Sequence, residues 1–268
     1  MIPLVVLDLD GTVIGSRGHV EDCVWQAVDK AKAAGMKFAV CTGRPCAGVA
    51  QKVAARLALS GPHIFQNGAQ IAYPSGEALK VFALKELVAR SLVEQARALS
   101  LTLELYSPTT LFVERKTALG EAHAKMIGVS PIVRDLLEVA ASEPVVRAQW
   151  VLRAADAPKV LAQAPTGVQV SSATAPALPD TLFVSVTQAE VSKGAAVRLL
   201  AEHLKLNLAD VVAVGDSVGD IPLLDAVGFP VVMGNGDPLL KERYATVAGD
   251  VDRCGVVPVI ERALTEQV

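Results

Sequence analysis

Residues 1–12 read MIPLVVLDLDGT, and this stretch decides the fold. The apolar run Leu4–Leu7 has no polar alternation, which is typical of a strand buried on both faces. Asp8 and Asp10 follow it, and residues two apart on an extended chain face the same side. Two ionised carboxylates there repel each other, so the pair favours a bound divalent cation, an acid/base role for one carboxyl group, or both. A plain Asp-Gly turn into solvent is the alternative.

Three further apolar runs end in polar or glycine residues in the same way. They are Phe38–Cys41 before Thr42-Gly43, Val211–Val214 before Gly215-Asp216, and Val231–Met233 before Gly234-Asn235. Such continuous runs indicate a parallel sheet covered by helices on both faces, and ligands of these sheets bind beyond the carboxyl ends of the strands. We therefore predict an α/β fold, with a doubly wound, Rossmann-like core and its site at that edge.

Helical patterns separate these runs. Periodic apolar residues predict helices over 21–34, 193–204 and 238–244, and Pro45 and Pro222 stand where first helical residues are expected. The middle of the chain differs, because a helical stretch over 85–99 is followed by β-rich segments with recurrent Pro and Gly. We expect an inserted α+β cap domain over residues 82–186 and a core domain built from residues 1–81 and 187–268.

A second pair of carboxylates follows the third apolar run. Gly215-Asp216-Ser217-Val218-Gly219-Asp220 puts two aspartates at a predicted strand end. If this strand neighbours the first, four carboxylates meet, and that charge demands a cation. Hard oxygen ligands select Mg²⁺. Asp220 taken alone is also explained as the cap of a helix that begins at Ile221.

Three other positions carry weaker signals for a bound anion. Thr42-Gly43-Arg44 offers a hydroxyl and backbone N–H groups at a predicted helix start, although an ordinary loop looks similar. Lys193 begins a helix, where the macrodipole disfavours a cation unless an anion lies nearby, but most lysines are simply solvated. Asn67-Gly68 predicts a hairpin turn, with ligand contact by Asn67 as the lesser alternative.

In order and spacing, these segments resemble the haloacid dehalogenase superfamily, and within it the Cof-type phosphatases with a type IIB cap. Asp8-Leu9-Asp10-Gly11-Thr12 resembles the first motif, Thr42-Gly43-Arg44 the second, Lys193-Gly194 the third and residues 215–220 the fourth. The cap is inserted between the second motif and the third. The resemblance extends over nearly the whole chain through three weaker segments: Asn67-Gly68-Ala69, Met233-Gly234-Asn235-Gly236 and Cys254-Gly255-Val256.

The resemblance implies a role for each aspartate. Asp8 would be the nucleophile and Asp10 the general acid/base. Mg²⁺ would be bound by Asp8, by Asp216 and by the backbone carbonyl of Asp10. Asp220 would order the water shell of the metal.

The resemblance also implies a phosphate site. Thr42 would hydrogen-bond the transferring phosphoryl group, and Lys193 would bridge it to Asp8. The residues expected to bind substrate or phosphate are Gly11, Thr42, Gly43, Arg44, Asn67 and Lys193. One position departs from the family, which commonly has Asn where this chain has Gly219. Because Gly offers no side-chain hydrogen bond, we expect reduced or altered activity.

We therefore predict an enzyme that hydrolyses a small phosphorylated metabolite, such as a sugar phosphate, with Mg²⁺ and a phospho-aspartate on Asp8. Substrate choice should lie largely in the cap. A phosphomutase-like phosphotransferase is the first alternative, since it would share nearly every catalytic residue. A weakly active binding or regulatory module is the second alternative, because Gly219 stands where the family commonly has Asn. The sequence does not indicate an oligomeric state.

Composition argues against several other classes. The chain has 268 residues, 51% hydrophobic, and 25 Lys and Arg against 28 Asp and Glu give a net charge of −3, which offers no basic face for nucleic acid. No apolar run reaches the roughly 18–20 residues of a membrane helix. Four cysteines without metal or disulfide spacing predict reduced thiols in a cytoplasmic protein, with Cys46 near a helix start as a candidate for a lowered pKa. They are Cys23, Cys41, Cys46 and Cys254.

Overall fold

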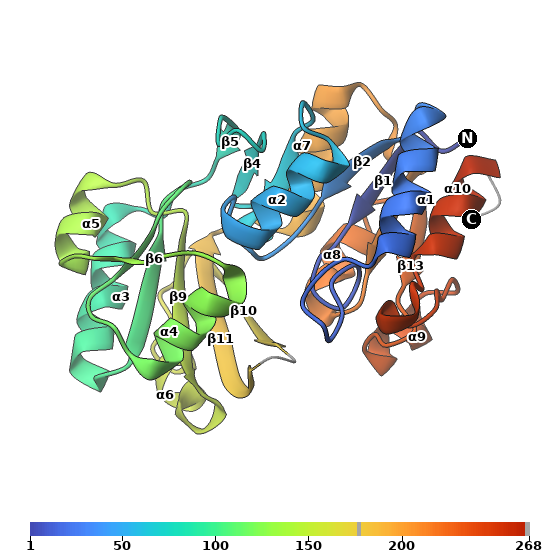
Figure 1. Cartoon of the computed structure of the whole chain (residues 1–268). Helices are drawn as coiled ribbons and strands as arrows, with labels where there is room; N and C mark the ends of the chain where they lie inside the picture. Colours follow the sequence, from blue (N-terminus) through green and yellow to red (C-terminus); the bar gives the residue numbers. More distant parts are fainter. Residues whose placement is uncertain (176–177, 266–268) are drawn as a thin grey trace.

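The four apolar runs form the four parallel strands of one sheet (Figure 1). In spatial order the strands are β13 (Phe229–Val232), β12 (Val211–Gly215), β1 (Leu4–Leu7) and β2 (Lys37–Val40). The computed structural model describes residues 1–175 and 178–265. Because chain order reverses at β1, the carboxyl ends of β1 and β12 form the switch point at which ligands bind in such sheets.

Helices cover both faces of this sheet, as its continuous apolar strands require. One face packs against α1 (Asp22–Ala33), α2 (Gly48–Leu57) and α10 (Val257–Thr265). The other packs against α7 (Lys193–Leu204), α8 (Ile221–Leu224) and α9 (Pro238–Arg243). The predicted α/β core with its doubly wound parallel sheet is thus confirmed.

A second, six-stranded sheet lies in the middle of the chain. Its strands, in spatial order, are β10 (Val168–Ala175), β11 (Leu178–Gln188), β9 (Arg147–Arg153), β6 (Thr102–Tyr106), β7 (Leu111–Val113) and β8 (Ile132–Val133). The helices between them are α3 (Glu86–Leu99), α4 (Ala118–Ile127), α5 (Leu136–Ser142) and α6 (Ala157–Leu161). The inserted α+β part of the fold is confirmed. The exact boundaries of core and cap remain a prediction.

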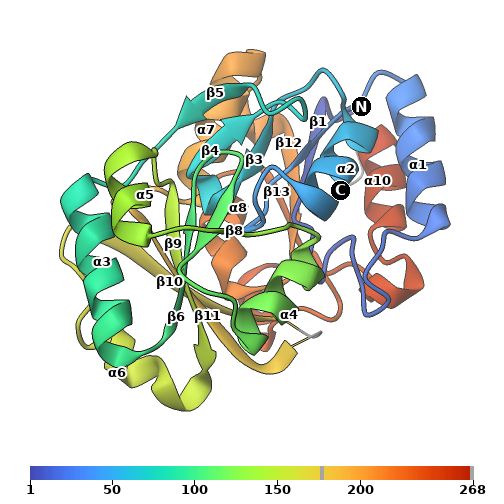
Figure 2. The same cartoon turned by 60° about the vertical axis from the view of Figure 1, so that its left-hand side comes forward.

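The six-stranded sheet has one apolar face and one polar face. Leu103, Leu105 and Trp150 pack with α3 and α5, which lie on the side away from the core in Figures 1 and 2. Alternate residues face the opposite way, and several of them, such as Glu104 and Gln149, are polar and buried. Helix α4 contacts β6, β9 and β11 and also α2 of the core. The polar face is therefore the one that looks toward the core.

A three-stranded antiparallel sheet joins the two parts. It consists of β3 (His63–Phe65), β4 (Gln70–Ala72) and β5 (Ala78–Val81). Asn67 and Gly68 both have positive φ in the turn between β3 and β4, so the predicted hairpin is confirmed. A bridge from Cys41 to Ile64 attaches this hairpin to the edge of the core sheet.

Two local predictions are wrong. Helix α2 begins at Gly48 and not at Pro45, because Ala47 is extended and Gly48 has a φ of +57°, which interrupts any helix from Pro45. A Cβ on Gly48 would collide with the backbone of Ile127 and Gly128, so this glycine lets the core loop approach α4 closely.

The prediction of four reduced cysteines is also wrong. Cys23 in α1 and Cys254 before α10 form a disulfide, with their Cα atoms 6.4 Å apart. Sequence spacing gave no sign of this pair, because 231 positions separate the two residues. Burial raises the pKa of the Cys46 thiol to about 11, so Cys46 is a packing residue and not an activated thiol. In the described part of the chain, no helix is both long and apolar enough to cross a membrane.

Candidate active site

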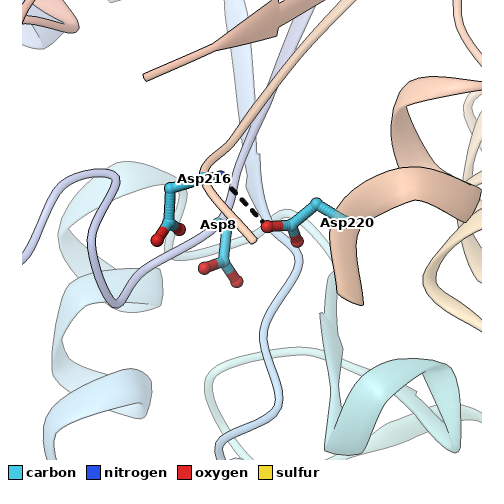
Figure 3. A group of neighbouring side chains, drawn as sticks. All are labelled: Asp8, Asp216 and Asp220. Carbon is cyan, nitrogen blue, oxygen red and sulfur yellow. Dashed lines mark hydrogen bonds between the residues drawn. The ribbon is translucent and has the colours of Figure 1, made fainter. Parts of the chain in front are cut away.

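Three carboxylates meet at the switch point of the core sheet (Figure 3). Asp8 follows β1, Asp216 follows β12, and Asp220 ends the short 3-10 turn Val218–Asp220. One oxygen atom from each carboxylate lies within 4.8 Å of the other two. Residues some two hundred positions apart are brought together because β1 and β12 are paired in register, with Leu7 opposite Val214.

Lys193 supplies the only cationic side chain that the described residues place in direct hydrogen-bond contact with this group. Its Nζ donates to Asp8 Oδ1 at 2.6 Å and to Asp220 Oδ1 at 2.5 Å, and the side chain is buried. Lys193 is the first residue of α7, and Ser192 caps that helix by accepting from the N–H of Ala195. The alternative of a solvated surface lysine is therefore wrong.

Asp220 both caps its turn and belongs to the acidic group. Its Oδ2 accepts hydrogen bonds from the N–H groups of Asp216 and Ser217 and from the Ser217 hydroxyl. Gly215 makes this loop possible, because a Cβ there would lie 2.6 Å from the Cβ of Asp220. The alternative that Asp220 caps the helix beginning at Ile221 is wrong, because its side chain makes no cap hydrogen bond to α8; Asp220 closes the turn before that helix and belongs to the acidic group.

Burial and mutual repulsion shift the pKa values in this group. Desolvation raises the pKa of Asp8 well above its ordinary value; Lys193 opposes this, while Asp220 and Asp216 add to it. Desolvation and the neighbouring Asp220 raise the pKa of Asp216 to about 7. For Lys193 burial acts in the opposite direction, but Asp220 and Asp8 raise its pKa well above normal. Three carboxylates against one ammonium leave an excess of negative charge that a divalent cation would neutralise.

Asp10 lies outside this acidic group. Its carboxylate pairs with Arg44, through Nε to Oδ2 at 2.8 Å and Nη2 to Oδ1 at 2.6 Å. The predicted meeting of four carboxylates is therefore reduced to three, and any contact from Asp10 to a metal would use its backbone carbonyl. Arg44 also donates to the carbonyl of Met126 in α4 at 3.4 Å, so it connects Asp10 to the cap.

The predicted phosphate-binding residues Thr42, Gly43 and Gly11 lie on two loops, one after β2 and one after β1. Thr42 is buried, and its hydroxyl accepts from the N–H of Arg44 at 3.2 Å. Gly43 lies against Asn67, because a Cβ on it would be 2.9 Å from Asn67 Oδ1. On the other side Gly11, with a φ of +81°, lies so close to Asp216 that a side chain would collide with that carboxylate.

Sequence reasoning missed three residues that hold these loops. The Thr12 hydroxyl donates to Asp216 Oδ1 at 3.2 Å. Asn235 donates to the carbonyl of Gly11 at 2.8 Å, and its position after the fourth apolar run was the available signal. Arg147 of the cap sheet donates to the carbonyl of Gly43 at 2.5 Å, and no motif marked it.

Comparison with known proteins decides the family. The family model described as haloacid dehalogenase-like hydrolase matches residues 5–260. The chain belongs to this family. The resemblance seen in its motifs is confirmed, and with it the prediction of a phosphatase. The acidic group of Asp8, Asp216 and Asp220 fits the divalent metal that phosphatases of this family generally use.

Relatives and solved structures agree with this assignment. The HMP-PP phosphatase of Cronobacter sakazakii is 27% identical over 90% of this chain and 87% of its own length. YxeH of Bacillus subtilis, named as a candidate phosphatase, is 26% identical over 90% and 91%. In fold, the chain matches the phosphatase BT1666 of Bacteroides thetaiotaomicron with a TM-score of 0.80 at 24% identity, covering 98% and 95% of the two chains. It matches the subclass IIB sugar phosphatase BT4131 with a TM-score of 0.81 at 18% identity, covering 97% and 98%.

A divalent cation should stabilise the folded protein at this site. Thermal melting in MgCl₂ at about one hundred times its Kd should raise Tm by about 5 °C over NaCl of equal ionic strength. The pKa of Asp216 rises on folding from 3.8 to about 7. Without a cation, its contribution to the free energy of unfolding therefore decreases as pH rises through that window. The shift in Tm should be larger at pH 8 than at pH 6, because the cation binds the ionised form.

The matched control is Asp210→Asn, an exposed aspartate at the other end of β12. This variant should keep the full shift in Tm, and Asp216→Asn should lose most of it. Equal shifts in the two variants would show that the cation binds elsewhere.

Proposed function

We propose that this protein hydrolyses the phosphomonoester of a small metabolite in a Mg²⁺-dependent reaction, through a phospho-aspartate on Asp8. The observation that carries the proposal is the contact of buried Lys193 with Asp8 inside a group of three carboxylates. Hard oxygen donors of this kind suit Mg²⁺, which takes one or two carboxylates together with waters and substrate phosphate. When bound, the cation would offset negative charge on the phosphoryl oxygens.

The side chains of this site divide the reaction into two steps. Asp8 attacks the phosphorus in line with the leaving oxygen, while Lys193 neutralises a phosphoryl oxygen and orients the nucleophile. Protonated Asp10 gives its proton to the leaving alkoxide. In the second step the Asp10 carboxylate takes a proton from water as this water attacks the phosphorus of the phospho-aspartate; the bond from phosphorus to the Asp8 oxygen breaks, which frees inorganic phosphate and restores the Asp8 carboxylate. Two smaller barriers replace one that is among the highest of uncatalysed reactions.

In this proposal the loops around Asp8 position the phosphoryl group and the side chain of Asp10. Thr42 and the backbone N–H groups after it would hold the transferring phosphoryl group, beside Gly11 on the opposite loop. Arg44 would keep the Asp10 carboxyl group aligned through its two hydrogen bonds. Such positioning is the main source of rate in phosphoryl transfer.

The substrate class follows from the relatives. An HMP-PP phosphatase and a sugar phosphatase are among the similar proteins, which supports a small phosphorylated metabolite as substrate. The cap, residues 82–186, would select it, and the core, residues 1–81 and 187–268, would carry the chemistry. No feature of the site favours transfer to a sugar over transfer to water. A cytoplasmic location stays a prediction.

Asp8→Asn should lower Mg²⁺-dependent kcat by at least about 1,000-fold, because the amide cannot form the covalent intermediate. The measurement is release of free phosphate from p-nitrophenyl phosphate and from a sugar phosphate, with Asp210→Asn as the control. Full retention of hydrolysis in Asp8→Asn would show that the nucleophile is another residue. A sugar isomer formed without free phosphate would show a phosphomutase instead.

Gly219→Asn tests the departure from the family pattern. Among the described residues, a Cβ on Gly219 meets only the Ser217 hydroxyl, at 3.4 Å, so these residues leave room for the new side chain. One added hydrogen bond should raise kcat/KM about 2- to 10-fold. Gly219→Ala supplies the Cβ without the amide and should stay near the wild-type value. An alanine variant as active as the asparagine variant would contradict a role for the missing amide.

A further inference from the structure

Arg147 is a buried cation without a carboxylate partner. It begins β9, and only 4% of the residue is exposed. Its Nη1 donates to the carbonyl of Gly43, and its guanidinium carbon lies 4.2 Å from the ring centre of Tyr106. Its Nε has no hydrogen-bond partner among the described residues, and none of their carboxylates lies within salt-bridge distance of it. A neutral carbonyl and a ring face leave most of its charge uncompensated.

The nearest acidic residue, Glu104, is already occupied. Its two carboxylate oxygens accept from the Tyr106 hydroxyl at 2.7 Å, from Nδ1 of His123 at 3.0 Å and from the Gln149 amide at 3.2 Å. Glu104 is fully buried, so this set of donors fixes its direction. Glu104 reduces the charge around Arg147 at longer range but gives it no hydrogen bond. The guanidinium therefore keeps donor capacity that the protein does not use.

Arg147 contacts the predicted phosphate-binding loop of the core. Its partner Gly43 lies between Thr42, expected to hold the phosphoryl group, and Arg44, which holds the proposed acid Asp10. The polar face of the cap sheet looks toward the core, and β10 at its edge touches the turn Val218–Asp220. A leaving group that extended from Asp8 toward this face would come within reach of Arg147.

We propose that Arg147 binds a second anionic group, a phosphate or a carboxylate, carried by the leaving group of the substrate. This inference rests on the proposed phosphatase function and narrows it. The substrates it selects are bisphosphates and phosphorylated acids, and neutral sugar phosphates are the poorer ones. The planar fork of arginine suits both anions, because each presents two oxygens at matching spacing.

Two pairs of substrates test the proposal in the full-length wild-type enzyme. 3-Phosphoglycerate and glycerol 3-phosphate differ by a carboxylate in place of a hydroxymethyl group. Fructose 1,6-bisphosphate and fructose 6-phosphate differ by one phosphate. With Mg²⁺ present, kcat/KM should be about 10- to 100-fold higher for the anionic member of at least one pair, which also tells a carboxylate from a phosphate.

The variant Arg147→Gln should remove this preference by lowering kcat/KM for the anionic member toward that of its neutral partner. Hydrolysis of p-nitrophenyl phosphate, whose leaving group has no second anionic group to reach Arg147, should fall by a smaller factor, which measures the loss of the contact to Gly43 alone. That activity also reports that the variant is folded. If Arg147 only ties the cap to Gly43, all five substrates should slow by the same factor, and the proposal would be overturned.

Equal kcat/KM within both pairs in the wild-type enzyme would overturn the proposal as well, whether or not Arg147→Gln folds. The proposed phosphatase function would survive that result, because p-nitrophenyl phosphate would still be hydrolysed through Asp8. Absence of Mg²⁺-dependent hydrolysis of every substrate would instead contradict the proposed function itself.

Discussion

Repulsion among buried carboxylates is the constraint on which the rest of this structure depends. Asp8, Asp216 and Asp220 lie at the ends of two paired strands, with one lysine between two of them. The raised pKa values of Asp8 and Asp216 indicate that the protein alone does not neutralise this group. The fold nevertheless holds them together through specific devices. Gly215 and Gly11 allow close approach, the Thr12 hydroxyl donates to Asp216 Oδ1, and backbone N–H groups and a hydroxyl donate to Asp220 Oδ2.

Such an arrangement suits a site that binds a divalent cation and an anionic substrate. In a site built for stability, a well-packed apolar group of similar volume would serve as well or better. In our proposal the negative charge prepares the site for a divalent metal, and Lys193 and Arg44 pair with the proposed nucleophile Asp8 and the proposed acid/base Asp10. The cap also holds buried charged groups. Its polar face carries Arg147 and Glu104 in a buried network that contributes little to the apolar core. We therefore propose that the core loops carry the chemistry and that the cap carries recognition.

The sequence predicted the core sheet and most of the acidic site because both depend on local patterns. Uninterrupted apolar runs specify strands buried on both faces, and the residues after them must lie at one edge. Asp8, Asp216 and Asp220 were found in this way, and Lys193 was found from its place at a predicted helix start and from the family resemblance. The partner of Asp10 could not be found, because the salt bridge to Arg44 depends on how two loops from different strands face each other. Arg147 was missed for a related reason, since in sequence it is one more residue of a strand. The Cys23–Cys254 disulfide depends on the packing of α1 against the segment before α10, which no spacing rule describes.

A crystal structure of the protein grown with Mn²⁺ in place of Mg²⁺ would test the central claim most directly, through the anomalous scattering of the metal. If the acidic group binds a divalent metal, one strong peak should lie at bonding distance from the carboxylates of Asp8 and Asp216, with Lys193 still in contact with Asp8. A metal bound at another surface, or an acidic group that binds none at saturating Mn²⁺, would contradict it.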